Sequence, residues 1–227
     1  MNKRRTTSIF ITLSIILGTL LVSCTSTSGI DIDRARELES KEIRNYQGEN
    51  LSSILDFREN SIRGPQYINI EDYRLEITGL VENPIEYTYA EIITGNRPYK
   101  KIVTLNCVEG WSATILWEGI LLRDLIRESI PSTNATVVIF QAYDGYTTSF
   151  QTDYIMKNDI IIAYKINDVT LPQERGFPFQ LVAESKWGYK WIKWITKIEL
   201  SDVTDYQGYW ESRGYSNSAN LDEDFLE

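Results

Sequence analysis

The segment TLNCVEGWS, residues 104–112, sets a single cysteine between an apolar, strand-like run and a tryptophan. Only one other cysteine, Cys24, occurs in the 227-residue chain. Free cysteines are among the most buried residue types, so the simplest interpretation of Cys107 alone is a small apolar residue of the core. If Cys24 is used for another purpose, Cys107 has no disulfide partner in the chain, which is unusual outside the cytoplasm. The segment therefore raises the question of what this thiol does.

The composition restricts the chemistry that is available. The chain contains no histidine, which excludes a zinc site, a Ser/His/Asp triad, a Cys/His protease pair and a haem held by histidine. Any catalysis must use Cys107, carboxylates, lysine, arginine, tyrosine or a cofactor.

The N-terminal sequence is typical of a targeting segment, because basic residues within positions 1–5 are followed by an apolar run over residues 8–22. The run ends in LVSC, residues 21–24, which resembles the lipobox of a bacterial lipoprotein, where the chain is cut before the cysteine and its sulfur is acylated. We predict a lipoprotein signal peptide over residues 1–23 and a lipid anchor at Cys24, which places the protein outside the cytoplasm on a membrane. A plain N-terminal membrane helix is the alternative, since the run approaches spanning length.

Downstream of Cys24, residues 24–50 are predicted to be a tether or linker. The charged stretch from Thr25 to about Asn60 contains RARELESKEIR, which predicts either a short exposed helix or a solvated linker, and we expect no core residues in this stretch. We place one domain at residues 51–217, because about 200 residues suit a single core. An acidic C-terminal tail follows at residues 218–227.

The charge of the chain disfavours nucleic acid as a partner. Removal of the leader lowers the number of lysines and arginines from 23 to 20, against 32 acidic residues, and changes the net charge from −9 to −12. A surface of this charge repels phosphate backbones, so no nucleic acid is expected.

Short β-rich runs dominate from Tyr73 onward and are separated by turn signals such as ENP, YDG, IND and ERG. The runs are YRLEITGL, KIVTLNC, ATVVIFQAY, YTTSF, DIIIAYKI, FPFQLVAE and WIKWITKIEL. Asp144 and Gly145 lie between two runs and predict a two-residue hairpin turn that needs positive φ. The sequence GILLRDLIRE, residues 119–128, predicts a helix that ends before Pro131. We therefore predict the α+β class, mainly β, with few short helices at the sheet edges.

The last run, residues 191–200, alternates with a period of two, which predicts one strand with a core face and a half-polar face. The core face carries Ile192, Trp194, Thr196, Ile198 and Leu200, and the other face carries Trp191, Lys193, Ile195, Lys197 and Glu199.

Five segments occur together in this order: TLNCVEGWSATILWEGILLRDLI, YDGYTTSF, an LPxxRGFP turn, WGYKWIKWITKIEL and GYWESRGYSN. Together they resemble the molybdopterin-binding domain of the sulfite oxidase family, over roughly residues 51–217. The closest likeness is to bacterial domains of the methionine sulfoxide reductase catalytic subunit type. The resemblance implies a sulfite oxidase-type fold with mixed sheets, a molybdenum-molybdopterin cofactor and an oxidoreductase activity.

The resemblance also implies a role for Cys107, whose position in the CVEGW segment supplies a thiolate to molybdenum in the family. A soft thiolate suits such a metal, and a thiol committed to a metal needs no second cysteine. Val108 and Gln180 are likewise implied to contact the cofactor. The GYK of WGYKW, residues 188–190, matches the family motif at the phosphate end, with Gly188 allowing close approach, Tyr189 beside it and Lys190 pairing with phosphate.

Upstream, FRENSIRGPQ, residues 57–66, resembles the N-terminal arm that closes over the pterin in these domains. Within it, Arg58, Asn60 and Ser61 offer hydrogen bonds that a pterin edge needs. Without the resemblance, the same residues read as a polar loop.

Two positions depart from the reductase type. Gln180 stands where that type usually has an arginine, and Arg175 stands where it often has asparagine or histidine. A basic cluster for an anionic substrate such as sulfite cannot be assigned from the sequence. By analogy, the 143–146 hairpin lies near the metal, so Tyr143, Asp144 and Tyr146 are candidates for the mouth of the substrate pocket.

These features predict an exported, lipid-anchored molybdenum oxidoreductase that transfers an oxygen atom or electrons to or from a small substrate. Sulfoxide reduction and sulfite dehydrogenation share the site, and the form of the CVEGW segment favours oxide reduction. The chain has no CxxCH, so a separate redox carrier is expected, of which a membrane haem protein is one kind.

The alternative is a lipid-anchored binding or structural module that keeps the fold without cofactor. Arg4 and Arg5 are adjacent, but KRRTTSIF departs from the usual twin-arginine pattern, and export of an unfolded chain would leave the domain without its cofactor.

Overall fold

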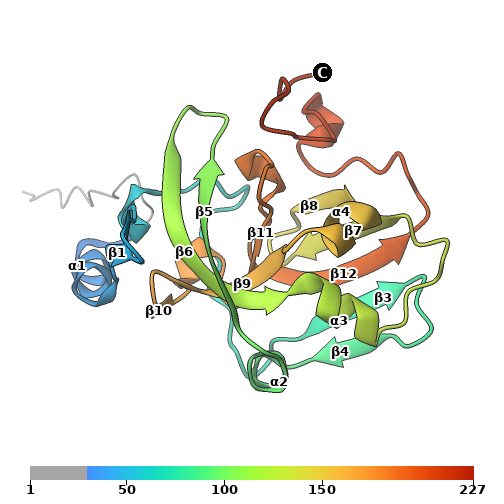
Figure 1. Ribbon diagram of the computed structural model, residues 1–227, viewed down its shortest axis with the longest axis horizontal. Coiled ribbons are helices and arrows are strands. Elements are labelled where there is room, and N and C mark those ends of the chain that lie inside the picture. The colour runs from blue at the N-terminus through green and yellow to red at the C-terminus, as the bar shows by residue number, and fades with distance from the viewer. Residues whose placement is uncertain (1–29) are drawn as a thin grey trace, which may run out of the picture.

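The computed structural model describes residues 30–227, and Figure 1 shows their arrangement. The predicted signal peptide, Cys24 and the first part of the tether lie outside these residues. Within residues 30–227, no helix is both long enough and apolar enough to cross a bilayer.

The first sheet is antiparallel and is built around a long hairpin. Its strands are β5 (Tyr99–Asn106), β6 (Ser112–Leu121), β9 (Ile161–Ile166), β10 (Val169–Thr170) and β11 (Gln180–Val182). Strands β5 and β6 pair from Tyr99 opposite Gly119 to Asn106 opposite Ser112, and β9 pairs with β6, β10 and β11. The hairpin projects beyond the rest of its sheet in Figure 1, so its tip stands apart from the central pairing.

Strand β9 shows why this sheet forms. Five of its six residues are buried, as a continuous apolar run predicts for a central strand covered on both faces. Asn167 and Asp168 join β9 to β10 with φ of 47° and 68°. This is the two-residue hairpin geometry in which both central residues have positive φ, and asparagine and aspartate tolerate it better than most residues.

The second sheet has the strand order β4-β3-β12-β7-β8. The strands are β3 (Leu75–Gly79), β4 (Ile85–Tyr87), β7 (Val137–Ala142), β8 (Thr147–Gln151) and β12 (Ile195–Ser201). Strands β12 and β3 are parallel, whereas the other pairs are antiparallel. The sheet is therefore mixed, and the predicted class is confirmed: the chain is mainly β, with mixed pairing.

The helices of the described residues are short. The α-helices are α1 (Ile32–Lys41), α2 (Tyr89–Gly95), α3 (Leu122–Glu128) and α4 (Thr152–Lys157). The 3-10 helices are η1 (Ile54–Asp56), η2 (Gln173–Arg175), η3 (Gly188–Lys190) and η4 (Glu211–Arg213). A two-stranded ribbon of β1 (Asn45–Tyr46) and β2 (Glu49–Asn50) follows α1.

The predicted helix over residues 119–128 begins three residues later than expected. Gly119, Ile120 and Leu121 belong to the end of β6, where they pair with β9. A register shift lies between Glu118 and Gly119, and a Cβ on Gly119 would lie 2.7 Å from the Cα of Ala163. Pairing across the sheet therefore overrides the local helical pattern, and the glycine permits the close approach of the two strands.

The predicted strand over residues 191–200 is also shorter. Strand β12 begins at Ile195, after Trp194 adopts a φ of 53°, and a register shift separates Ile195 from Lys197. The left-handed residue reverses the alternation, so Ile195 is buried and Thr196 is only half-buried. The prediction of one continuous alternating strand is wrong at this point, although Ile198 and Leu200 face the core as expected.

The hairpin at Asp144 and Gly145 has a three-residue loop instead of the two-residue loop that we predicted. The amide of Gly145 donates to the carbonyl of Ala142 at 3.0 Å, and the amide of Ala142 donates to the carbonyl of Tyr146 at 2.9 Å. Gly145 has a φ of 86°, and it is the residue that needs positive φ. This is the common hairpin of a turn followed by a left-handed glycine.

Residues 30–60 contribute to the core, so the expectation that this segment holds no core residues is wrong. Ala35 and Leu38 of α1 are buried, and Asp31 caps the helix. The carboxylate of Glu42 accepts hydrogen bonds from the hydroxyl of Ser53 at 2.6 Å and the amide of Asn167 at 3.0 Å. The helix that was one of the two alternatives therefore exists and is fastened to the first sheet.

The acidic C-terminal segment, residues 218–227, packs against the domain. Ala219 is fully buried, Asn220 pairs with Lys186, and the ring of Phe225 lies 5.6 Å from that of Trp187. These contacts hold the end of the chain beside η3.

The close approach at Gly119 predicts a specific loss of stability. In Gly119→Ala the new methyl group must push β6 away from β9, so the free energy of unfolding should fall by at least about 2 kcal/mol. Urea unfolding of the two chains measures the difference. Gly95→Ala is the matched control, because a Cβ there has no neighbour within 4 Å, and it should change stability by less than about 0.5 kcal/mol. Equal effects of the two substitutions would contradict the packing argument.

Candidate functional site

Cys107 lies where β5 ends and the hairpin loop begins. The loop is closed by two hydrogen bonds, from the amide of Cys107 to the carbonyl of Trp111 at 2.9 Å and from the amide of Gly110 to the carbonyl of Cys107 at 3.0 Å. Val103, Leu105 and Cys107 follow one another at every second position and are all buried, so they share one face. The strand period therefore directs the thiol inward.

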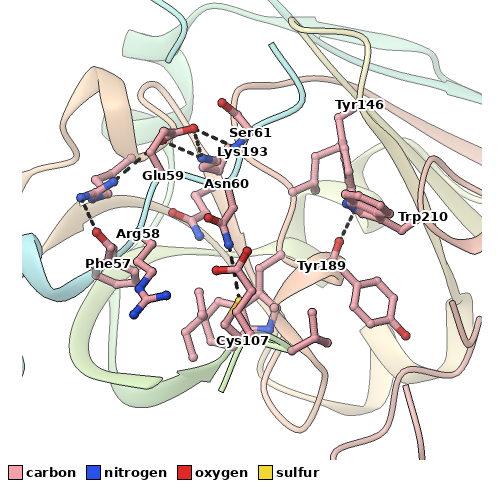
Figure 2. Close-up of a pocket in the computed structure, with 18 of the residues that line it drawn as sticks. Phe57, Arg58, Glu59, Asn60, Ser61, Cys107, Tyr146, Tyr189, Lys193 and Trp210 are labelled. Carbon is pink, nitrogen blue, oxygen red and sulfur yellow. Dashed lines mark hydrogen bonds and ion pairs between the residues drawn. The ribbon is translucent and has the colours of Figure 1, made fainter. Parts of the chain in front are cut away.

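The thiol faces a cavity of about 460 Å³, a size typical of small-molecule and cofactor sites. Figure 2 shows the side chain of Asn60 reaching down toward Cys107, with the amide nitrogen 3.5 Å from the sulfur. Burial raises the pKa of the Cys107 thiol, and hydrogen bonds from the backbone of Glu109 and from Asn60 act in the opposite direction.

Most of the predicted site residues line this cavity. Those in its wall are Arg58, Asn60, Ser61, Cys107, Val108, Asp144, Tyr146, Gln180, Gly188 and Tyr189. They come from the arm, the β5–β6 loop, the β7–β8 hairpin, β11 and η3, which lie far apart in sequence. Their roles toward a cofactor stay predictions, but the fold brings them to one place.

Lys190 is not among the residues that line this cavity, and its role toward a phosphate stays a prediction. Its ammonium is buried behind the wall, 2.7 Å from a carboxylate oxygen of Glu211 and 3.2 Å from the side-chain oxygen of Asn217, and it lies over the ring of Phe150. Burial lowers the pKa of Lys190, and Glu211 offsets part of this effect. A buried ammonium needs a counterion, and here the protein provides it.

Tyr143 also lies outside the cavity wall. Its side chain is 59% exposed, and its backbone amide donates to the carbonyl of Trp194. Its neighbours Asp144 and Tyr146 point inward. Tyr143 and Asp144 belong to the three-residue loop, where side chains do not alternate between two faces as they do in a strand. The loop conformation therefore decides that Asp144 enters the cavity and Tyr143 does not.

Asp144 is a buried carboxyl group in the cavity wall. One of its oxygens accepts the backbone N–H of Tyr146 at 3.0 Å. Burial raises the pKa of Asp144, while the Tyr146 hydrogen bond and the charges of Lys193 and Arg63 act in the opposite direction. The hydroxyl of Tyr146 donates to the carbonyl of Tyr189, which joins the β7–β8 hairpin to η3.

Gly188 lets η3 lie directly against the strand that carries the thiol. A Cβ on Gly188 would lie 3.1 Å from the carbonyl oxygen of Asn106 and 3.6 Å from the Cα of Cys107. Trp187 forms an isolated parallel bridge with Asn106. The absence of a side chain thus serves close packing of two parts of the wall.

An ion-paired cluster of Glu59, Arg175 and Lys193 forms another part of the wall, and Figure 2 shows Glu59 and Lys193 away from Cys107, on the far side of Asn60. Both carboxylate oxygens of Glu59 lie 3.3 Å from the Lys193 ammonium, and Arg175 lies 3.8 Å from one of them. Burial lowers the pKa of Arg175 to about 10, so the guanidinium keeps its charge at neutral pH. Burial also lowers the pKa of Lys193, and Glu59 opposes that shift.

Sequence reasoning missed this cluster, together with Trp210 and Tyr215 in the wall. Glu59 and Lys193 read as ordinary polar residues of a loop and of a strand face. The available signal was the charged residue Arg175 within the LPxxRGFP turn, but its partner Glu59 lies 116 positions earlier in the chain. Only the tertiary fold brings them together.

The residues of the cavity fit a molybdopterin cofactor. The hydroxyl of Ser61 is buried without a hydrogen-bond partner among residues 30–227, in a wall that also presents a thiol and the amide groups of Asn60 and Gln180. A buried hydroxyl without a partner is costly, so this position suits a ligand with polar edges. The soft sulfur of Cys107 suits a soft metal centre.

Comparisons with known proteins agree with this arrangement. The model of the family described as "Oxidoreductase molybdopterin binding domain" matches residues 62–210. The protein-methionine-sulfoxide reductase catalytic subunit MsrP of Gluconobacter oxydans is 33% identical over 147 residues, which cover 57% of this chain and 47% of that protein. The oxidoreductase YuiH of Bacillus subtilis is 28% identical over 152 residues, which cover 66% of this chain and 76% of that protein. The chain thus spans about half the length of the Gluconobacter relative.

A solved structure shows the same fold. The sulfane dehydrogenase SoxCD from Paracoccus pantotrophus matches with a TM-score of 0.60 and 22% sequence identity, over 68% of this chain and 43% of that chain. At this identity the likeness concerns the fold alone.

The buried position of Lys190 predicts a coupled effect on stability. Lys190→Met leaves the carboxylate of Glu211 buried beside Thr148 only, so the free energy of unfolding should fall by about 3 kcal/mol or more. Adding Glu211→Gln removes the uncompensated charge and should recover at least half of the loss. Urea unfolding of the cofactor-free chain measures both effects.

The exposed pair Lys157–Asp153 provides the control, because Lys157→Met should cost less than about 1 kcal/mol. If Lys190→Met left the cofactor-free chain unchanged and only weakened cofactor binding, the ammonium would be a phosphate ligand after all.

Proposed function

Because the chain belongs to the oxidoreductase molybdopterin-binding domain family, we propose that it reduces a small, uncharged oxide outside the cytoplasm while anchored to a membrane by lipid. Membership makes it a molybdopterin-dependent oxidoreductase. The observation that carries the proposal is the thiol of Cys107 beneath Asn60, in a cavity lined by both polar and aromatic side chains.

When bound, the cofactor supplies a metal centre that accepts or gives up an oxygen atom with two electrons. The protein would contribute the Cys107 thiolate to that centre, with Asn60 donating to the sulfur. A hydrogen bond to a ligating sulfur holds the ligand in place and tunes its electron donation. Ser61 and Gln180 would bind the polar edges of the pterin. The positive charge of Arg58, which also lines the cavity, acts to lower the pKa of the Cys107 thiol.

The charges of the cavity favour an uncharged substrate. Three basic side chains line it, Arg58, Arg175 and Lys193, and so do three acidic ones, Glu59, Glu109 and Asp144. Glu59 pairs with both Arg175 and Lys193. An anion such as sulfite is attracted by a surplus of positive charge, and with its three carboxyl groups ionised this wall has no such surplus. Oxide reduction is therefore favoured over sulfite oxidation.

Reduction of an oxide consumes two electrons and two protons and releases water. Asp144 is suited to hold one of these protons, because burial raises its pKa and it faces the cavity. Its carboxyl group keeps its orientation through the N–H of Tyr146. The aromatic residues Trp111, Trp210 and Tyr215 add apolar surface to the same cavity and suit the hydrocarbon part of such a substrate.

The electrons must come from another protein, since the sequence has no haem-binding CxxCH. The Gluconobacter relative is named a catalytic subunit, which implies a second subunit in that system. By analogy, a membrane redox protein, for example one that holds haem, would deliver electrons to this chain. The predicted lipid at Cys24 would keep the two at the same surface, and the acidic sequence leaves nucleic acid without a role.

The proposal predicts the metal content of the protein. In a host that makes molybdopterin, the full chain should contain about one molybdenum per chain by elemental analysis, because Cys107 supplies its protein ligand. The Cys107→Ser variant should lose most of its molybdenum, and any molybdenum that it keeps should be inactive. Serine has nearly the same size as cysteine, but its hydroxyl is a poor ligand for a soft metal centre. A purified chain should reduce methionine sulfoxide with a reduced viologen dye and should not oxidise sulfite.

Ser112→Ala is the matched control, because this exposed residue lies at the same hairpin end outside the cavity wall and should keep its metal. Absence of molybdenum from the folded wild-type chain, in a host shown to make the cofactor, would leave the cofactor-free module as the function. Sulfite oxidation without sulfoxide reduction would reverse the proposed direction.

The proposed location predicts two further outcomes. Cys24→Ser should move the protein from the membrane fraction to the soluble extracytoplasmic fraction, because the acylated sulfur is lost. Replacement of Arg4 and Arg5 by lysine should block export of the metal-loaded protein if it travels folded by the twin-arginine route. Fractionation with immunoblotting measures both. Membrane retention of Cys24→Ser after leader removal would contradict the lipid anchor.

A further inference from the structure

The arm, residues 57–66, covers the thiol but is weakly attached by its own backbone. Among residues 30–227, it forms no backbone hydrogen bond with the backbone of another segment. Asn60 reaches from the arm to the sulfur of Cys107, and Arg58 and Ser61 also enter the cavity wall. The position of these groups therefore depends on side chains that hold the arm from elsewhere.

One such side chain is Arg175, which holds the upstream end of the arm. Its Nε donates to the carbonyl of Ile54 at 3.2 Å, and its Nη2 donates to the carbonyl of Phe57 at 3.0 Å. The guanidinium also lies 5.4 Å from the centre of the Phe57 ring and 3.8 Å from the carboxylate of Glu59. Only an arginine can bind two carbonyls and a carboxylate with one planar group.

Gln173, on the same turn, holds the downstream end. Its side-chain oxygen accepts the backbone N–H of Ile68 at 3.0 Å, and its side-chain nitrogen donates to the carbonyl of Ile68 at 3.3 Å. The side chain thus pairs with the backbone just beyond the arm as a neighbouring strand would.

The turn that carries both residues, residues 172–176, is itself held firmly. The indole N–H of Trp194 donates to the carbonyl of Gln173 at 2.7 Å, and the amide of Trp194 donates to the carbonyl of Gly176 at 3.3 Å. Gly176 has a φ of 108°, and a Cβ there would lie 3.0 Å from the Cβ of Lys193. The turn is therefore anchored to the residues that precede β12 and not to the arm alone.

From these contacts we propose that the turn 172–176 is a clasp that fastens both ends of the arm, with Arg175 as a positioning residue for Asn60 over the Cys107 sulfur. The clasp keeps the arm closed even without cofactor, so that the thiol is shielded and the cofactor-facing groups are preformed. The functional part of this inference rests on the proposed function, whereas the shielding of the thiol does not.

The test uses the full chain with Cys24→Ser, so that Cys107 is the only thiol. In the cofactor-free protein, the rate of Cys107 modification by a disulfide reagent reports opening of the arm above the sulfur. Limited trypsin cleavage after Arg58 and Arg63 reports exposure of the arm itself. Urea unfolding of each variant is measured in parallel, so that local opening is separated from global unfolding.

Arg175→Gln should raise both rates by about tenfold or more, because at least one buried hydrogen bond to the arm is lost. The increase should be present without urea and nearly independent of low urea concentrations, as local opening requires. Arg175→Lys keeps the charge beside Glu59 but not the planar group, and its rates should lie between those of Arg175→Gln and the parent. Gln173→Ala, which removes no charge, should raise the same rates.

Arg123→Gln is the matched control, because Arg123 also bonds a carbonyl, that of Asn158, and a carboxylate, that of Asp159, away from the cavity. Its rates should equal those of the parent. The clasp would be overturned if Cys107 were modified no faster in Arg175→Gln and Gln173→Ala than in Arg123→Gln. It would also be overturned if the modification and cleavage rates of these variants rose only with global unfolding. If Arg175→Gln fails to fold, Gln173→Ala decides alone.

A second measurement links the clasp to the cofactor. The metal-loaded chain should lose molybdenum several times faster from Arg175→Gln than from Arg123→Gln during dialysis, and its thiolate-to-metal absorption band should shift as Asn60 leaves the sulfur. If the wild-type chain binds no molybdenum, the proposed function fails while the thiol and trypsin measurements still decide the clasp. If molybdenum is bound but neither rate changes, the clasp fails and the function stands.

Discussion

The pairing of β5 with β6 is the constraint on which the site depends, because it fixes where the thiol stands and which way it points. The ladder runs without interruption from Tyr99 opposite Gly119 to Asn106 opposite Ser112, and the loop after it is closed by the bonds between Cys107 and Trp111. A register change of one residue would send the thiol to the opposite face. Every other wall of the cavity is brought to this tip from a different part of the chain.

Buried charges near the tip of the β5–β6 hairpin are paired in two different arrangements. Behind the wall, Lys190 and Glu211 form a buried ion pair that is not part of the lining of this cavity. In the wall itself, one carboxylate, Glu59, is shared between two cations. The first pair stabilises the end of the chain, since Glu211 follows β12 by ten residues. The three groups in the wall, together with Arg58, Glu109 and Asp144, set the electrostatic character of the cavity, and equal numbers of basic and acidic groups limit which substrates are attracted.

Much of the fold could be predicted from the sequence, because its strands have short apolar runs and ordinary turn signals. The mixed, mainly β class was within reach, and most of the predicted site residues line the cavity, since the motifs that carry the resemblance are local. What could not be predicted came from tertiary packing: Gly119 extends β6 because β9 lies against it, and Trp194 reverses the alternation before β12. Lys190 was assigned by motif, but burial beside Glu211 decides its direction, and no local pattern reports a partner 21 residues away.

The cavity is completed by segments outside the part of the chain that matches the family model. That match covers residues 62–210, whereas Asn60 and Ser61 precede it and Tyr215 follows it. These flanking segments are held against residues 62–210 by tertiary contacts. The cavity is therefore complete only if such contacts hold both segments in place. The buried network of Glu42, Ser53 and Asn167 supplies such contacts at the base of the arm, and packing of the C-terminal segment on η3 supplies them on the other side. A shared fold can thus acquire its own selectivity from flanking segments, provided that a few buried polar contacts hold them in place.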